Sequence, residues 1–349
     1  MPRLFSSFTI KGLALKNRLV MAPMATNLAD EAGHPSAAQI EHYRERVAGG
    51  VGLVIVESVL VNRLPEVASG RLGLWDDDCV APLTALARAI REAGAAPAVQ
   101  IVDLTLRARQ ALPAALAATE IEAIVAQFAA AAARARAAGF AAVELHSAHA
   151  TTLADFLSRA ANRRPDEYGG SNEGRARFTV RALEAMRVAV GDDYPLLCRF
   201  NGDEFTLQGN TLLHAVPIAG LLLRAGADVL DVSQGGRTED GAYAQQRGRP
   251  AAWLPDGCNL YVPREIKRAT GAPVIGVGKL GNPEVAEAAL ADGACDLVAL
   301  GRPLLADPDW PRKAQAGRYT AIKRCRCDDR CMELFREKKA VHCVTFAEA

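Results

Sequence analysis

The chain has 349 residues, of which 50% are hydrophobic and 23% are charged, and its formal net charge is +1. This length and apolar fraction suffice for a large core in one big domain or two smaller ones, and the balanced charge argues against nucleic-acid or membrane partners. No apolar run reaches the length of a membrane-spanning helix, and the first residues do not begin a signal peptide. We therefore expect a cytoplasmic protein.

Short apolar runs alternate with helical patterns along the chain. We expect buried strands at 19–22, 51–56, 96–100, 141–145, 196–199, 229–233, 274–277 and 297–300. Helical patterns lie between them, for example at 121–138, 176–190, 212–225 and 283–292. The continuous apolar runs are typical of strands buried on both faces. Eight strand-helix alternations favour an α/β fold of the (β/α)8 TIM barrel type over residues 1–318, and an open doubly wound sheet is the alternative because strand count does not show closure.

Two histidines follow the fourth predicted strand. His146 and His149 come directly after the run 141–145, and the carboxyl ends of the strands are where such barrels build their active sites. Neutral imidazoles donate hydrogen bonds to anionic oxygens. The pair therefore suits a site that holds a developing negative charge. The alternative interpretation is that both are ordinary core histidines.

Glycines beside cations follow the last two predicted strands. Gly278-Lys279 follows the seventh, and Gly301-Arg302 follows the eighth. Backbone N–H groups at glycine turns can approach phosphate oxygens, and this end of a barrel is a frequent phosphate site. The alternative is two turns with solvated cations.

Two further polar residues end apolar strands. Arg199 ends the fifth strand and Gln100 the third. A buried guanidinium must be paired, either in an ion pair with a carboxylate such as Asp231 or against an electron-rich ring. With the phosphate site and the histidines, these residues meet the polar needs of flavin mononucleotide (FMN).

Several longer motifs carry a family resemblance. They lie at 15–24, 52–57, 143–149, 162–171 and 296–308. Through them, the chain from residue 4 to about 345 resembles the Old Yellow Enzyme family of FMN-dependent ene-reductases, in the branch with 2,4-dienoyl-CoA reductase and trimethylamine dehydrogenase. The resemblance implies a TIM barrel with FMN at the carboxyl ends of its strands.

The resemblance also implies roles for individual residues. The flavin ring would contact Pro23, Met24, Ala25, Ser58, Gln100 and Arg199, and the phosphate would lie at Gly278, Lys279, Gly301 and Arg302. His146 and His149 would bind the carbonyl oxygen of a small-molecule enone or enoyl thioester. Reduced flavin would then transfer hydride to the activated C=C bond. The electrons would come from NADH or NADPH, or from a separate electron-donor protein.

One position departs from the family pattern at the proton donor. Relatives carry a tyrosine two residues after the second histidine, whereas this chain has Thr151. A threonine hydroxyl is a far weaker acid than a phenol. Thr151 is therefore a poor donor, and our hypothesis for a replacement is Tyr243.

Four of the eight cysteines crowd into the last 25 residues, at Cys325, Cys327, Cys331 and Cys343. Four thiolates could hold an iron–sulfur cluster or zinc, and spacing alone does not separate them. The resemblance favours a 4Fe-4S cluster in a tail over residues 319–349. The related tails have one more residue between the first two cysteines. Zinc, or no metal, is the alternative.

The sequence leaves two other functions open. One is an oxidative reaction of the amine dehydrogenase or demethylase type, and the other is an electron-relay subunit of a larger flavin and iron–sulfur complex. An amine substrate needs a base or an aromatic bowl, so the histidine pair favours carbonyl binding and an ene-reductase. The oligomeric state stays open, with a homo-oligomer possible.

Overall fold

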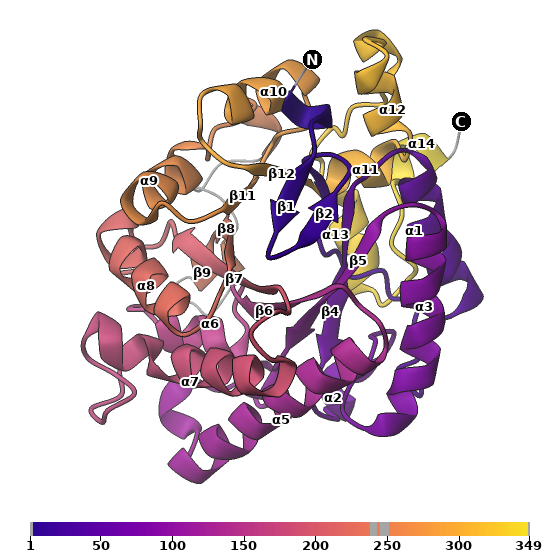
Figure 1. Ribbon diagram of the computed structural model, residues 1–349. Coiled ribbons are helices and arrows are strands. Elements are labelled where there is room, and N and C mark those ends of the chain that lie inside the picture. Colours follow the sequence, from indigo (N-terminus) through magenta and orange to yellow (C-terminus); the bar gives the residue numbers. More distant parts are fainter. Residues whose placement is uncertain (1–2, 238–242, 245–250, 348–349) are drawn as a thin grey trace.

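Eight strands close into a parallel barrel in the order β11-β12-β3-β4-β5-β6-β7-β8 in the computed structural model of the chain (Figure 1). The structure describes residues 3–237, 243–244 and 251–347. The barrel strands are Leu19–Met21 (β3), Leu53–Leu60 (β4), Ala96–Val102 (β5), Ala142–Ser147 (β6), Leu196–Asp203 (β7), Val229–Gln234 (β8), Val274–Val277 (β11) and Leu297–Leu300 (β12). The predicted TIM barrel is confirmed, and the open-sheet alternative is wrong.

Helices surround the barrel and connect its strands (Figure 1). They are α1 (Ala37–Ala48), α2 (Pro65–Ala68), α3 (Val80–Glu92), α4 (Thr105–Ala108), α5 (Ala118–Ala137), α6 (Thr152–Leu157), α7 (Asn172–Val190), α8 (Leu212–Arg224), α9 (Tyr261–Thr270), α10 (Pro283–Ala291), α11 (Arg302–Ala306), α12 (Trp310–Gln315), α13 (Arg330–Arg336) and α14 (Val344–Ala347). Side-chain caps begin several of them. Ser36 accepts a hydrogen bond from the Gln39 backbone at α1, and Ser171 accepts one from Gly174 at α7. Such caps satisfy amide groups that the first helical turn leaves unpaired.

The apolar core has two layers, because alternate strand residues face the barrel axis or the helices. The inner layer includes Val20, Ile55, Leu197 and Ile275. A hairpin of two short strands, β1 (Phe8–Ile10) and β2 (Leu13–Leu15), also joins this inner layer and closes the amino end of the barrel. We did not predict this hairpin, because strands of three residues leave almost no periodic signal.

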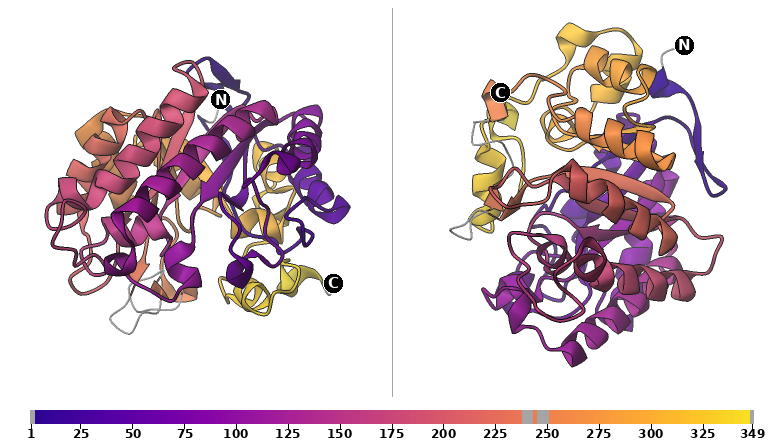
Figure 2. Two further views of the ribbon diagram at one scale, coloured as in Figure 1. Left: turned by 90° about the horizontal axis from the view of Figure 1, so that it is seen from below. Right: turned by 90° about the vertical axis from the view of Figure 1, so that its left-hand side faces the viewer.

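The cysteine-bearing tail packs at the other end of the barrel. Figure 2 shows the hairpin and the tail helix α13 on opposite sides of the molecule. The Val341 amide donates to the Thr26 carbonyl at 2.8 Å, and the Asn27 side chain donates to the carbonyls of Phe335 and Lys339 at 3.1 and 3.0 Å. The tail is therefore anchored to the loop that follows β3. The boundary at residue 318 stays a prediction.

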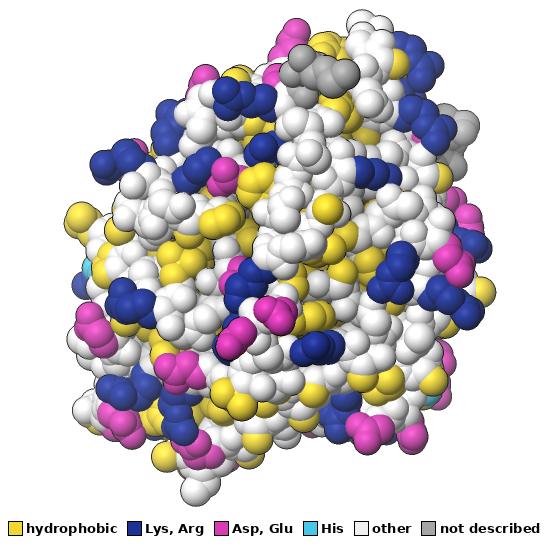
Figure 3. Space-filling model, viewed as in Figure 1, with side chains coloured by type: hydrophobic (Ala, Val, Ile, Leu, Met, Phe, Trp, Pro, Cys, Tyr) yellow, Lys and Arg dark blue, Asp and Glu magenta, His cyan; other side chains and the backbone are white. Residues whose placement is uncertain are grey.

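Over its described residues, the molecular face at the hairpin end has no large patch of only positive or only negative charge. Lysine and arginine side chains alternate there with aspartate and glutamate over the visible surface (Figure 3). Among the described helices, none combines the length and apolar character needed to cross a bilayer.

Truncating the hairpin anchor should destabilise the barrel. Leu15 is 1% exposed in the inner core, so Leu15→Ala should lower the free energy of unfolding by about 2–5 kcal/mol. Urea unfolding measures the change. The exposed Thr9 on the paired strand provides the control, and Thr9→Ala should change the value by less than about 0.5 kcal/mol. Equal losses of unfolding free energy in the two variants would show that the packing of the hairpin into the inner core does not stabilise the barrel.

Candidate active site

A cavity of about 420 Å³ opens at the carboxyl ends of the barrel strands. This lies within the range of about 300–1,000 Å³ typical of small-molecule and cofactor sites. Its lining brings together nine residues singled out from the sequence, namely Pro23, Met24, Ala25, His149, Arg199, Gly278, Lys279, Gly301 and Arg302. The tail contributes Cys325 and Cys327 to the same wall.

The two histidines lie side by side at the end of β6. Their ring centroids are 5.2 Å apart with an interplanar angle of 71°. His149 Nε2 lies 2.6 Å from Ser233 Oγ, whereas His146 Nδ1 is buried without a hydrogen-bond partner in the described part of the chain. Burial, and then the positive charge of Arg199, holds the pKa of both imidazoles well below the usual range. Both rings are therefore neutral at pH 7, and each carries one N–H donor.

The backbone holds the second histidine in a strained turn. His149 and Ala150 have φ of 60° and 55°, in the left-handed region that favours glycine. The next residue, Thr151, caps α6 by accepting from the Ala154 amide at 3.3 Å, and its hydroxyl donates to the His146 carbonyl at 3.2 Å. The Thr151 proton is thus directed at the backbone. A catalytic role for Thr151 stays a prediction.

A buried polar layer forms the floor beneath the histidines. Arg199 Nε lies 3.3 Å from Asp231 Oδ2, and the two residues are register partners on β7 and β8. On the neighbouring strands, the Gln100 amide donates to Glu144 Oε1 at 2.8 Å. Burial, and then the charge of Asp231, raises the pKa of Glu144. Arg199 makes the expected ion pair with Asp231 and also lines the cavity, and its contact with a flavin ring stays a prediction.

Some predicted residues lie off the cavity lining, His146 and Thr151 among them. Gln100 belongs to the floor, and Ser58 Oγ accepts a hydrogen bond of 3.5 Å from Arg71. Tyr243 lies in the short strand β10 (Tyr243–Ala244), which pairs with β9 (Gly236–Arg237). Its side chain falls outside the described residues, so the proton-donor hypothesis stays a prediction.

The predicted phosphate end has a tight backbone and two cations. A Cβ at Gly278, whose φ is 117°, would lie 2.9 Å from Gln234 Nε2, and a Cβ at Gly301 would lie 2.8 Å from Met24 Sδ. Lys279 Nζ donates to the Leu254 carbonyl. Arg302 lies 2.5 Å from Asp329 of the tail. The positive φ at Gly278 disfavours any residue with a side chain, whereas a side chain at Gly301 would have to displace that of Met24.

A buried carboxyl group behind the cavity fixes the loop after β3. Glu57, 1% exposed, accepts hydrogen bonds from the Thr26 backbone and from the Gln39 side chain, and its own amide donates to Tyr43 Oη at 2.9 Å. Burial raises the pKa of Glu57 to about 7. This role of Glu57 was not predicted from the sequence. The sequence feature that could have indicated it is a single carboxylate that follows four apolar residues of a buried strand.

Two of the tail cysteines are in contact. The Cys327 amide donates to Cys325 Sγ at 3.4 Å, and both residues line the cavity together with Arg302. Burial raises the pKa of the Cys331 thiol. Among the described residues, however, no group of three or more Cys, His, Asp or Glu is placed to hold a metal ion. As arranged, the four thiols do not form a ligand set. The 4Fe-4S cluster and the zinc alternative both stay predictions.

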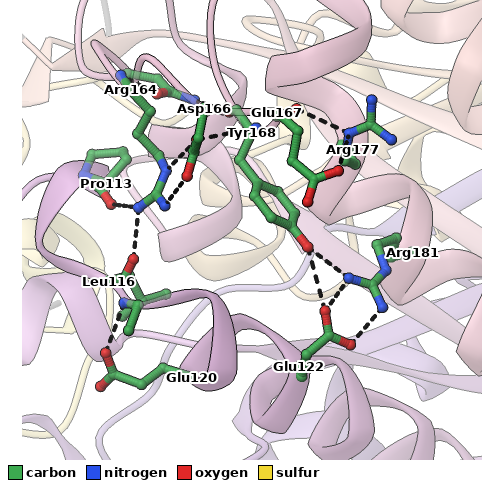
Figure 4. Close-up of polar contacts among 12 residues, drawn as sticks. Pro113, Leu116, Glu120, Glu122, Arg164, Asp166, Glu167, Tyr168, Arg177 and Arg181 are labelled. Atoms are coloured by element: carbon green, nitrogen blue, oxygen red, sulfur yellow. Dashed lines mark hydrogen bonds and ion pairs between the residues drawn. The ribbon is translucent and has the colours of Figure 1, made fainter.

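The motif at 162–171 has a structural role. Arg164 donates to the carbonyls of Pro113 and Leu116, each at 2.6 Å, and pairs with Asp166, while Tyr168 and Arg181 meet at Glu122 (Figure 4). The Arg164 side chain is 8% exposed. The motif ties the loop after β5 to α7, and thereby supports the segment that follows the histidines.

A family model for the NADH:flavin oxidoreductase / NADH oxidase family matches residues 3–112 and 105–321. The chain belongs to this family. It is 39% identical to an NADH oxidase of Thermoanaerobacter brockii over 346 residues, and 36% identical to an NADPH dehydrogenase of Geobacillus sp. (strain WCH70) over 336 residues. Among solved structures, it is similar to a 2-naphthoyl-CoA reductase with a TM-score of 0.90 and 28% identity. It is also similar to a histamine dehydrogenase from Rhizobium sp. 4-9, with a TM-score of 0.84 and 26% identity.

These relatives differ in length. The match covers 93% of this chain and 52% of the NADH oxidase, but 91% of this chain and 95% of the NADPH dehydrogenase. It covers 98% of this chain with 56% of the naphthoyl-CoA reductase chain, and 99% with 53% of the histamine dehydrogenase chain. This chain thus spans about half of the longer relatives.

Family membership implies FMN, and the cavity fits that group. Just off the cavity lining, at the ends of β6 and β7, the buried His146 Nδ1 and Asn201 Oδ1 lack hydrogen-bond partners among the described residues, which leaves both atoms open to a polar ligand. A Cβ at Gly278 or Gly301 would narrow the phosphate end. Pro23, Met24, Ala25 and Arg199 would hold the ring, and Lys279 and Arg302 would hold the phosphate.

Removing the motif arginine should destabilise the fold. Arg164→Ala leaves two buried carbonyls and a carboxylate without their donor, so the free energy of unfolding should fall by about 3–5 kcal/mol. The neighbouring Arg163 is exposed, and Arg163→Ala should cost less than about 0.5 kcal/mol. Urea unfolding of both variants tests this. A loss below 1 kcal/mol for Arg164→Ala would contradict the structural role.

The raised pKa of Glu57 should appear in the pH dependence of stability. Between its ordinary pKa of 4.5 and about 7, the folded state holds a proton that the unfolded state has released. Stability should therefore fall as pH rises through this window, by up to about 1.4 kcal/mol per pH unit for one proton, and level off above it. Glu57→Gln should flatten this slope in urea titrations from pH 4.5 to 8. An unchanged slope would assign the titration to another group.

Proposed function

We propose that this chain is an FMN-dependent ene-reductase that acts on the activated C=C bond of an α,β-unsaturated carbonyl compound or thioester. The histidine pair carries the proposal. Two neutral imidazoles, 5.2 Å apart at the mouth of a closed barrel, can both donate to one carbonyl oxygen. Such an oxygen gains negative charge when hydride reaches the β-carbon.

The residues would share the work as follows. His146 and His149 bind the carbonyl oxygen and stabilise the enolate through preorganised hydrogen bonds. Ser233 holds the His149 ring at 2.6 Å, and the Thr151 cap holds the backbone of the turn. Arg199, fixed by Asp231, keeps a positive charge at the floor. When bound, FMN supplies the hydride chemistry.

The names of relatives support a nicotinamide reductant. The relatives described as NADH oxidase and NADPH dehydrogenase point to NADH or NADPH as the electron source. The similarity to 2-naphthoyl-CoA reductase supports a conjugated thioester as a substrate class. The similarity to histamine dehydrogenase supports amine oxidation as the second candidate.

The tail adds a separate proposal. We propose that Cys325, Cys327, Cys331 and Cys343 bind a 4Fe-4S cluster after rearrangement, supported by the clustering of four cysteines in the tail and by the contact of Cys327 with Cys325. Iron and sulfide analysis of anaerobically purified protein tests it. About four of each per chain is expected, and iron-free protein with bound flavin would refute the cluster while leaving the ene-reductase proposal intact.

Loss of either imidazole should slow the oxidative half-reaction. In His146→Ala and His149→Ala, reoxidation of photoreduced flavin by an enone should slow by about 10²–10³-fold, because an oxyanion donor is lost. Anaerobic stopped-flow absorbance measures the rate, and the flavin content of each variant confirms that the cavity still binds FMN.

A partly exposed histidine on α8 provides the control. His214→Ala lies away from the cavity and should reoxidise at the wild-type rate. Wild-type rates in both site variants would refute the proposed role of the pair. Failure of every enone to reoxidise wild-type flavin, with reoxidation coupled to amine turnover instead, would favour the amine dehydrogenase candidate.

A further inference from the structure

Three cations of the tail line the cavity and have no part in the steps proposed above. Lys323, Arg324 and Arg326 stand on either side of Cys325 in the chain, and all three belong to the cavity lining. They are also exposed, so they lie where the cavity meets solvent. Within the described part of the chain, Asp256 is the one carboxylate of the lining. We call Lys323, Arg324 and Arg326 the cationic strip.

Two anchors hold the cationic strip on the cavity wall. At its start, the Lys323 amide donates to Oδ2 of the buried Asp307 at 2.8 Å, and Lys313 donates to the same oxygen at 2.7 Å. Three residues after its end, Asp329 pairs with Arg302 at 2.5 Å. The strip is thus fixed from both sides to residues of the barrel.

The charges of the strip have no carboxylate partner in the described part of the chain. Lys323 Nζ lies 5.7 Å from the ring centroid of Phe346, and neither Arg324 nor Arg326 makes a hydrogen bond or an ion pair with a described residue. The phosphate of FMN would use the cations that follow β11 and β12. The strip is therefore available to a second anion, and guanidinium groups match phosphate oxygens well.

An exposed aromatic ring lies beside the same cavity. Trp253, in the 3-10 turn Ala251–Trp253, is 77% exposed, although tryptophan is highly buried on average. Its neighbours Ala252 and Leu254 line the cavity. An indole left in solvent beside a pocket suits a planar ligand, because aromatic side chains stack on nucleobases.

Contacts at the phosphate end relate the indole to the strip. Lys279 and Arg302 follow β11 and β12, which are paired neighbours in the barrel, and both residues line the cavity. Lys279 Nζ donates to the carbonyl of Leu254, the residue after Trp253, and Arg302 holds Asp329 of the tail. The indole and the strip are therefore fastened to adjacent positions of one cavity wall.

We propose that the cationic strip and Trp253 bind the adenosine diphosphate group of a reactant. The pyrophosphate would lie on Arg324 and Arg326, and the adenine would stack on Trp253. NADH, NADPH and thioesters of coenzyme A share this group, and each carries its reacting end on a long arm that can enter the cavity. The inference rests on the proposed ene-reductase function, because it names the ligand class of the same site.

Calorimetric titration of the holoenzyme with ADP tests the site without turnover. Arg324→Gln and Arg326→Gln should each raise the dissociation constant by about threefold to fivefold, because a charge-assisted contact is lost at an exposed position. Trp253→Ala should raise it by about fivefold to tenfold through the loss of stacking, and Trp253→Phe should restore part of the affinity. Added salt should weaken binding to the wild type more than binding to either arginine variant.

Arg330 supplies the matched control. It is an exposed arginine of the same tail and is not among the described residues that line the cavity. Arg330→Gln removes the same charge and should leave the dissociation constant unchanged. The flavin and iron contents of every variant are measured, so that loss of a cofactor is not mistaken for loss of the site. Equal dissociation constants in the wild type and the strip variants would overturn the proposal, as would an equal loss in Arg330→Gln.

Two pairs of reactants identify which of them carries the group. Flavin reduction by NADPH is compared with reduction by N-benzyl-1,4-dihydronicotinamide, and flavin reoxidation by crotonyl-CoA is compared with reoxidation by the N-acetylcysteamine thioester of crotonate. In Arg326→Gln, the nucleotide-bearing member of one pair should react about threefold to fivefold more slowly below saturation, with its truncated partner unchanged.

The affected pair assigns the site to the reductant or to the thioester substrate. Wild-type rate ratios in both pairs would overturn the proposal, because no reactant would then use the strip. If no enone or thioester reoxidises the flavin while ADP binding still depends on Arg326 and Trp253, the ene-reductase function fails and the nucleotide site stands, with its ligand the reductant.

Discussion

The buried pair of Arg199 and Asp231 is the constraint on which the rest of the site depends. A guanidinium at the centre of a barrel must be paired, and strand register supplies the carboxylate directly opposite on the next strand. The same register places His146 beside Arg199 and Gln100 beside Glu144. The charges of the floor are thus set by how four adjacent strands align. The histidines stay neutral because burial, and then the charge of Arg199, lowers the pKa of both imidazoles, so that each keeps one N–H donor.

The fold could be predicted from the sequence because parallel strands covered on both faces are continuous apolar runs. Each of the eight expected strands coincides with a barrel strand. The expected ends of five strands were too early, by four residues at β4 and β7 and by one or two at β5, β6 and β8. β4 continues to Leu60 and β7 to Asp203, since polar residues such as Glu57 and Asn201 interrupt the pattern while the backbone still pairs. Hydrophobic periodicity does not register a polar side chain that is buried and hydrogen-bonded.

The site was predicted in part, for a similar reason. Residues that directly follow strands, such as Lys279 and Arg302, line the cavity as expected. Interactions between distant segments could not be foreseen. Arg302 also holds Asp329 of the tail, and Ser58 faces Arg71 rather than the cavity. A local sequence pattern does not predict that Asp329 pairs with Arg302, which lies 27 residues away in the chain. The tail was recognised by its cysteines, yet its observed contacts with the barrel run mainly through backbone groups and arginines.

Thr26 connects the barrel to the tail. Its amide is held from inside the barrel by Glu57, and its carbonyl is held from outside by Val341. The cavity loop is therefore clamped between a buried carboxyl group and the tail. If related barrels exchanged tails, the new tail would have to keep the backbone hydrogen bond to Thr26 as well as the spacing of its cysteines. The tail is in this sense a part of the cavity wall, and it cannot evolve as a free module.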